Sequence, residues 1–125
     1  MIIGIGTDLA EIDRFRKLIS RFNTSFTDRV FTSAEQQEAA MRNDPATYYA
    51  GRWAAKEALA KALGCGIGGS CALLEVEVCN QPTGQPRIEL RDNALNTLRR
   101  LGGKHIHLSV SHEANYAVAT VVIER

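Results

Sequence analysis

A single carboxylate among cations is the feature of this sequence with the clearest chemical meaning. Glu57 stands in the stretch AGRWAAKEALAKALGCGIGG, whose last six residues include four glycines. Three cations lie close to it along the chain: Arg52, Lys56 and Lys61. Helical residues advance by about 100° each, so Glu57 and Lys61 share one helix face, and we expect the other two cations to neighbour that face. Such a group can hold Mg²⁺ and a polyphosphate together, because Mg²⁺ binds one or two carboxylates plus phosphate and water.

A plainer explanation is open on these residues alone, since a Glu57–Lys61 pair is a routine surface contact worth about 0.3–0.5 kcal/mol. A second carboxylate, Asp8, lies near the end of the predicted strand MIIGIGTDL. Gly4, Gly6 and Asp8 alternate onto one face of that strand, and glycine in a strand often marks the close approach of a ligand or another backbone. The alternative is that Asp8 only caps the helix that follows.

The glycine loop is ambiguous by itself. Gly64, Gly66 and Gly69 fit the pattern G-x-G-x-x-G. A dinucleotide site of that kind needs a strand before the glycines, whereas here a helix comes first, so we exclude it. The sequence also lacks the G-K-[ST] of a P-loop. A loop whose backbone N–H groups contact a phosphate stays open.

The histidines offer a weaker signal near the C-terminus, in HIHLSVSH. The residues His105, His107, Ser109 and Ser111 share one strand face, and His112 begins the expected turn. A His–Ser hydrolase would need a third, orienting group that the sequence does not identify. For His112 a phosphate contact and a structural role in the turn both stay open.

Composition bounds the possibilities. The 125 residues are 45% hydrophobic and 23% charged, which is typical of one globular domain spanning residues 1–125. The net charge is +1 and aromatic residues make up 6%, which argues against a nucleic-acid partner. No apolar run approaches the roughly 18 residues of a membrane span, and no signal peptide is present, so we expect no membrane partner and a cytoplasmic location. Three cysteines fit no zinc spacing and read as reduced thiols.

The elements that must position these side chains follow from periodicity and capping signals. Helices are expected at residues 11–22, at 32–40 behind a Thr32–Glu35 capping box, at 46–63 after Asp44 and Pro45, and at 93–101 with Asp92 as cap. Strands are expected at 1–9, 73–79 and 87–90, with a final hairpin over 105–124 that turns at 113–115. This order predicts an α+β domain with an antiparallel sheet, one long helix and several short ones.

Three separated stretches then resemble one family. GIGTDLAEIDR, AGRWAAKEALAKALGCGIG and HLSVSHEANYAVATVVIE stand in the order found in holo-[acyl-carrier-protein] synthases, which are 4′-phosphopantetheinyl transferases. The segment FTDRVFTSAE resembles the family as well. Trp53 stands where many relatives have Phe, and Cys65 stands where many have Thr. The resemblance implies the 4′-phosphopantetheinyl transferase fold.

The implied activity is Mg²⁺-dependent transfer of phosphopantetheine from coenzyme A to a serine of apo-acyl carrier protein, in support of fatty acid biosynthesis. Adenosine 3′,5′-bisphosphate is the other product. By position, Asp8 and Glu57 resemble the metal ligands, and Glu57 and Lys61 the catalytic residues. The coenzyme A contacts would come from a set of five residues: Arg52, Lys61, Gly64, Gly66 and His112. The family also implies a homotrimer with active sites between subunits.

The resemblance suggests a role for the basic helix predicted at residues 11–22. Five cations and one acid lie between Arg14 and Arg29. Acyl carrier proteins are acidic, and complementary charge speeds encounter. We therefore expect the carrier to bind Arg14, Leu18, Arg21 and Arg29, unless these residues form only a solvated basic face. The competing hypothesis for the whole chain is a non-catalytic module that binds a nucleotide or an acidic protein, although such a module has no need of two carboxylates near a phosphate.

Overall fold

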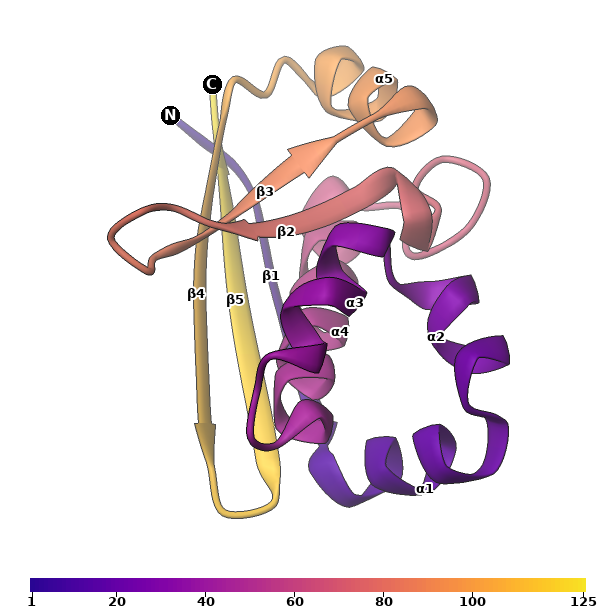
Figure 1. Cartoon of the computed structure of the whole chain (residues 1–125). Helices are drawn as coiled ribbons and strands as arrows, with labels where there is room; N and C mark the ends of the chain where they lie inside the picture. The colour runs from indigo at the N-terminus through magenta and orange to yellow at the C-terminus, as the bar shows by residue number, and fades with distance from the viewer.

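A computed structural model describes all 125 residues and confirms the expected α+β fold (Figure 1). The strands are β1 (Ile2–Glu11), β2 (Val76–Asn80), β3 (Pro86–Leu90), β4 (His105–Glu113) and β5 (Tyr116–Glu124). The helices are α1 (Ile12–Phe22), α2 (Thr24–Val30), α3 (Ser33–Ala40), α4 (Pro45–Leu63) and α5 (Asp92–Leu101), with a 3₁₀ turn at Leu73–Glu75. None of the helices combines the length and apolar character that crossing a membrane requires.

The main sheet has the order β1–β5–β4 and is antiparallel throughout. Helix α4 packs against one of its faces, and the short β2–β3 ribbon lies beside the helix (Figure 1). The inward residues of β5 are fully or almost fully buried: Ala117, Ala119, Val121 and Ile123. Ala54, Ala58 and Ala62 of α4 are buried as well, so small side chains allow the long helix to lie close to the sheet.

The two glycines of β1 have a specific packing reason. A Cβ atom on Gly6 would lie 1.9 Å from the Ala58 carbonyl oxygen, and one on Gly4 would lie 2.2 Å from that of Ala62. The glycines therefore admit another backbone, that of α4, rather than a ligand. Asp8 is not a helix cap, because β1 continues to Glu11 before α1 begins. Its side chain is instead held next to α4.

Several local signals act as expected and others do not. Thr32 and Glu35 form the capping box, Pro45 is the first residue of α4, and Gly64 ends that helix with a left-handed φ of 79°. The expectation that Asp92 caps α5 is wrong, because the Asn93 N–H donates to the Glu75 carboxylate instead. Two elements also differ from the expectation. Helix α2 is not among the predicted helices, and residues 73–75, predicted as strand, form a 3₁₀ turn.

The face of the main sheet turned away from α4 is open and partly apolar. Ile5 and Leu9 of β1 are 67% and 63% exposed, and Tyr116 and Val118 of β5 lie opposite this strand and are also exposed. A monomeric sheet seldom leaves such a row of large apolar side chains in water. This face matters below for assembly.

Candidate active site

Asp8 and Lys61 meet at one edge of the main sheet. The Lys61 Nζ donates to the Asp8 carboxylate and to the Thr7 carbonyl, at 3.0 Å in each case. The Asp8 side chain is 17% exposed and that of Lys61 is 51% exposed. A flexible ammonium therefore lies over a partly buried carboxylate, and this arrangement depends on the close β1–α4 contact.

Glu57 belongs to the same group. It is half-buried on α4, one turn before Lys61. Burial raises the pKa of Glu57, and the negative charge of Asp8 raises it further, while Lys61 and Arg14 lower it. The Glu57 carboxylate and the neighbouring Asp8 carboxylate are a natural ligand pair for a divalent cation, which relieves the repulsion between them.

Arg52 and His112 line a different pocket, of about 370 Å³. Arg52 is only 8% exposed; its guanidinium lies 4.3 Å from the centroid of the Tyr48 ring and donates to Asn80 at 2.8 Å. Its Nε–H is buried without a hydrogen-bond partner, which is costly unless a ligand supplies an acceptor. Sequence reasoning missed Tyr48 and Asn80, because only the packed structure brings them to Arg52.

The expected place of His112 in a turn is wrong. Strand β4 continues to Glu113, and His112 pairs with Ala117 of β5. Two residues, Ala114 and Asn115, make the hairpin turn. His112 therefore lies on strand β4, and its side chain lines the pocket that contains Arg52.

The two groups lie on opposite flanks of α4. Arg52 and Lys61 are nine residues apart, which corresponds to a rotation of about 180° around the helix. Asp8 lies on β1 and His112 on β4, and these are the two edge strands of the sheet, separated by β5. A single chain therefore does not assemble all the expected site residues in one place.

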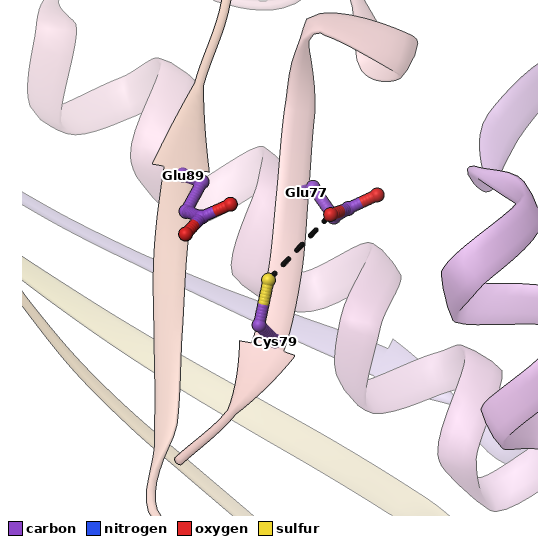
Figure 2. Close-up of side chains that lie close together, drawn as sticks. All are labelled: Glu77, Cys79 and Glu89. Carbon is purple, nitrogen blue, oxygen red and sulfur yellow. Dashed lines mark hydrogen bonds between the residues drawn. The ribbon is translucent and has the colours of Figure 1, made fainter.

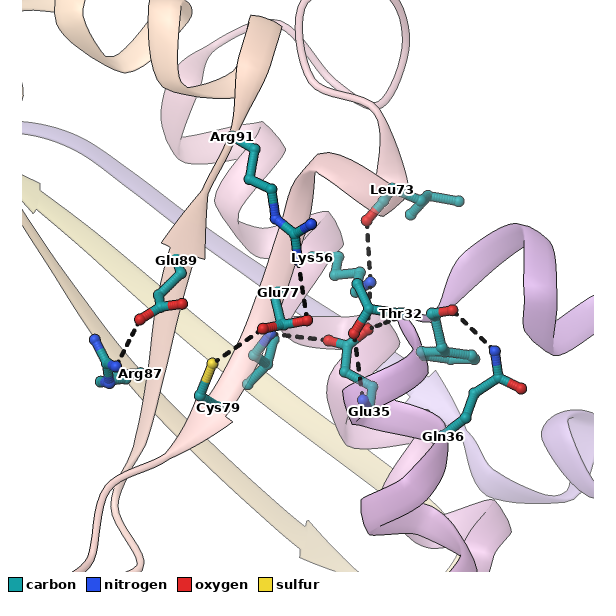
Figure 3. A network of polar contacts seen from close by, with 12 residues as sticks. Thr32, Glu35, Gln36, Lys56, Leu73, Glu77, Cys79, Arg87, Glu89 and Arg91 are labelled. Carbon is teal, nitrogen blue, oxygen red and sulfur yellow. Dashed lines mark hydrogen bonds and ion pairs between the residues drawn. The ribbon is translucent and has the colours of Figure 1, made fainter.

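Lys56 is not part of either group, so the expectation that it neighbours Glu57 and Lys61 as a phosphate contact is wrong. Its side chain is fully buried, and its Nζ donates to Glu35, the Val30 carbonyl and the Leu73 carbonyl at 2.7–3.0 Å (Figure 3). Burial lowers the pKa of Lys56, and the Glu35 carboxylate opposes that effect. This lysine joins three chain segments and is structural.

The glycine loop is an open surface segment directly after Lys61. Gly64 and Gly66 have φ values of 79° and 66°, and a Cβ atom on either would meet nothing within 4 Å. These two glycines are therefore required by backbone conformation rather than by close packing. Their N–H groups already donate to carbonyls of α4: that of Gly64 to Lys61 at 3.0 Å and that of Gly66 to Ala60 at 3.2 Å.

A basic cleft of about 310 Å³ runs along α1. Its lining includes Arg14, Leu18 and Arg21, as expected, together with Lys17. Arg29 lies on α2, outside this lining, although it is exposed. Helix α1 packs against α4, and the charge of Arg14 lowers the pKa of Glu57.

A second acidic group lies on the β2–β3 ribbon, where sequence reasoning found no site (Figure 2). The ligand atoms of Glu77, Cys79 and Glu89 lie within 4.8 Å of one another. Arg91 contacts Glu77 at 3.2 Å and Arg87 contacts Glu89 at 2.6 Å, so each carboxylate already has a cation (Figure 3). Only the register, which places Glu77 opposite Glu89, brings the group together.

Comparison with known proteins gives the class. Residues 4–121 match the sequence model of the 4′-phosphopantetheinyl transferase superfamily, and the chain belongs to it. The holo-[acyl-carrier-protein] synthase of Syntrophus aciditrophicus is 42% identical over 124 residues, covering 99% of this chain and 97% of the relative. This places the chain with the holo-[acyl-carrier-protein] synthases within the superfamily.

Solved structures of holo-[acyl-carrier-protein] synthases have the same fold as this chain. The holo-[acyl-carrier-protein] synthase of Neisseria meningitidis superposes with a TM-score of 0.92 at 34% identity, covering 100% of both chains. The Helicobacter pylori enzyme, whose structure is a complex with coenzyme A, gives a TM-score of 0.85 at 30% identity and covers 96% of this chain and 99% of its own. The expected fold family is thus confirmed.

Proposed function

We propose that this chain transfers the 4′-phosphopantetheine group of coenzyme A to a serine of an apo-acyl carrier protein, in support of fatty acid biosynthesis. The serine oxygen forms a bond to the β-phosphorus, the pyrophosphate P–O bond breaks, and adenosine 3′,5′-bisphosphate leaves. The observation that carries the proposal is the Asp8–Glu57–Lys61 group beside the basic cleft of α1, in a chain whose relatives are holo-[acyl-carrier-protein] synthases.

Asp8 and Glu57 are the residues that would hold Mg²⁺. The fit rests on two observations: both donors are carboxylate oxygens, and the charge of Asp8 raises the pKa of Glu57. Bound there, Mg²⁺ would supply positive charge to the pyrophosphate. The Glu77–Cys79–Glu89 group is a poorer candidate, since its carboxylates are already paired with arginines.

Lys61 has the catalytic role of stabilising the departing phosphate. Its ammonium is half-exposed and hydrogen-bonded only to oxygens of β1, so it can turn toward an anion that binds over the glycine loop. The attacking serine must lose a proton, and Glu57 is the carboxylate of this chain placed to accept it. A solvent water is the alternative acceptor.

Coenzyme A would contact both half-sites. Lys61, Gly64 and Gly66 lie at the C-terminal end of α4, where a phosphate can meet the Lys61 ammonium beside the two glycines. Arg52 and His112 lie on the other flank of α4, where the Arg52 Nε–H has no hydrogen-bond partner and could donate to a ligand oxygen. One ligand reaches both groups only if they come from different copies of the chain.

This separation supports a homotrimer with active sites between subunits. The β1 edge of one copy, carrying Asp8, would face the β4 edge of the next, carrying His112. Such a contact between unlike edges is heterologous, and it closes into a ring of three when successive copies are related by a rotation of about 120°. The exposed side chains of Ile5, Leu9, Tyr116 and Val118 supply an apolar face for that contact.

The acidic carrier protein would bind along α1, at Arg14, Leu18 and Arg21, with Arg29 at the margin. Helix α1 packs against α4, so a carrier bound there can present its serine to the carboxylate pair. The cytoplasmic location predicted from the sequence is part of this proposal. The direct test is the gain of phosphopantetheine mass by an apo-acyl carrier protein incubated with the chain, coenzyme A and Mg²⁺.

A further inference from the structure

Arg52 is a buried cation without a counter-charge. It lines a pocket of about 370 Å³, yet it forms none of the ion pairs of this structure. The one carboxylate that lines the same pocket, Asp44, pairs with Arg16 instead. A charge taken out of water is costly unless an anion faces it. The free charge of Arg52 therefore points to an anionic ligand in the pocket.

Two neutral groups hold the Arg52 guanidinium in place. The ring of Tyr48, four residues earlier on α4, has its centroid 4.3 Å from the guanidinium carbon. Asn80 is the last residue of β2, which lies beside α4 (Figure 1), and its side-chain oxygen accepts a hydrogen bond from the Arg52 Nη2 at 2.8 Å. Burial raises the pKa of the Tyr48 hydroxyl, so both partners are uncharged at neutral pH. They orient the cation without neutralising it.

The Tyr48 ring is itself fixed, and two arginines contact it. It is buried and meets the Tyr49 ring at an interplanar angle of 70°. The Arg42 guanidinium also lies over the Tyr48 ring, 5.0 Å from its centroid, but it pairs with Glu38 at 2.8 Å. The charge of Arg42 is thus already met by a carboxylate. Of the two arginines, only Arg52 keeps a charge that no carboxylate neutralises.

We propose that Tyr48 and Asn80 are positioning residues for Arg52. They fix its guanidinium with neutral groups and so leave its whole charge for the ligand. A long side chain that is already held loses less rotamer freedom on binding, which favours affinity. A carboxylate in place of Asn80 would hold the guanidinium as well, but it would compete with an anionic ligand for it. The inference rests on the proposed function only where it names coenzyme A as that ligand.

Calorimetric titration of the full chain with coenzyme A, without a carrier protein, measures the effect of the ring. Tyr48→Leu removes the aromatic face and should raise the Kd about tenfold, whereas Tyr48→Phe keeps that face and should change the Kd less than about twofold. Tyr49→Leu is the matched control, because Tyr49 is similarly buried on the same helix and its ring packs against Phe31 rather than an arginine. It should lower the free energy of unfolding without changing the Kd.

The same titration tests the neutral partner on β2. Asn80 is exposed, so its variants should fold even if Tyr48→Leu does not. Asn80→Ala should raise the Kd several-fold, because one hold on the guanidinium is lost. Asn80→Asp should raise it further, because the new carboxylate pairs with Arg52. If Asn80 acted only through its shape, the order would be reversed, since aspartate has nearly the shape of asparagine.

A double-mutant cycle separates positioning from general packing. In the Arg52→Met background neither Tyr48→Leu nor Asn80→Ala should raise the Kd further, because the group that they orient is gone. In transfer assays the single variants should raise the KM for coenzyme A with a smaller effect on kcat. Additive increases in the Kd would overturn the proposal, and so would an Asn80→Asp variant that binds coenzyme A as tightly as the parent chain.

The two proposals fail in different experiments. A chain that modifies no carrier protein but shows this coupled pattern of coenzyme A binding would contradict the proposed function and support the positioning role. A chain that transfers phosphopantetheine normally but shows additive losses of binding would do the reverse.

Discussion

Arg52 and Lys61 project from opposite flanks of the same helix. Arg52 is buried in the pocket that His112 lines, and Lys61 is hydrogen-bonded to Asp8 at the other edge of the sheet. Both residues are expected to contact one coenzyme A molecule. We therefore propose that a neighbouring copy completes each site.

Mixing two inactive variants tests this proposal. Arg52→Met leaves the Glu57 half-site intact, and Glu57→Gln leaves the Arg52 half-site intact. When equal amounts of the two variants assemble at random into the proposed trimers, about a quarter of all sites would combine two intact halves. Activity should therefore return when the variants are co-expressed with different tags. Mixing Glu57→Gln with the double variant serves as control and should stay inactive. Activity no greater than the sum of the separate variants would place each site within one chain.

The carboxylate pair can be separated from the second acidic group. We expect Glu57→Gln to lower transfer about 100-fold or more, because it removes a metal ligand and a charge from the reacting centre. Glu89→Gln, on the β2–β3 ribbon, should leave transfer unchanged. Circular dichroism checks that both variants fold. Near-normal turnover by folded Glu57→Gln at saturating Mg²⁺ would show that the site has been misassigned.

The two lysines of α4 should fail in different ways. Lys56→Met leaves Glu35 charged and unpaired in the core, which should cost about 3–5 kcal/mol in the free energy of unfolding. Lys61→Met breaks a half-exposed pair and should cost less than about 1 kcal/mol while lowering kcat. Urea denaturation and steady-state kinetics measure the two effects. A stable but inactive Lys56→Met variant would contradict the structural role.

The docking role of α1 predicts a selective change in KM. Arg14→Glu should raise the KM for the carrier protein about tenfold, with a much smaller change for coenzyme A, because it reverses a charge in the cleft. Arg99→Glu, on α5 at the opposite end of the molecule (Figure 1), is the matched control. Added salt should raise the KM for the carrier protein more for the parent chain than for Arg14→Glu. Equal effects on both substrates would argue against docking at α1.

Much of the fold could be predicted because it rests on local signals. The Thr32–Glu35 capping box and the Pro45 and Gly64 boundaries of α4 each act within a few residues. The cap of α5 could not be predicted, since Glu75 reaches Asn93 across a long sequence separation. Helix α2 lacks a clear apolar period, so nothing in its sequence distinguished it from a loop.

The site was predictable as a set of residues but not as a geometry. Asp8, Glu57 and Lys61 come together as expected, because Gly4 and Gly6 allow α4 to approach β1. Lys56 shows the limit of helix periodicity, which gave its angle around α4 but not the buried carboxylate and carbonyls that surround it. The expectation that Arg52 neighbours the Glu57–Lys61 face is wrong as well, because nine residues rotate Arg52 about 180° from Lys61. The sheet order then shows that this rotation separates the candidate site into two halves.

The most direct measurement is the intact mass of an apo-acyl carrier protein after incubation with this chain, coenzyme A and Mg²⁺, with a parallel sample containing EDTA. We predict a gain of one phosphopantetheine that is absent with EDTA and restored by excess Mg²⁺. No gain with folded protein, across several carrier proteins, would contradict the proposed transferase activity. A gain that persists in EDTA would contradict the metal role of Asp8 and Glu57.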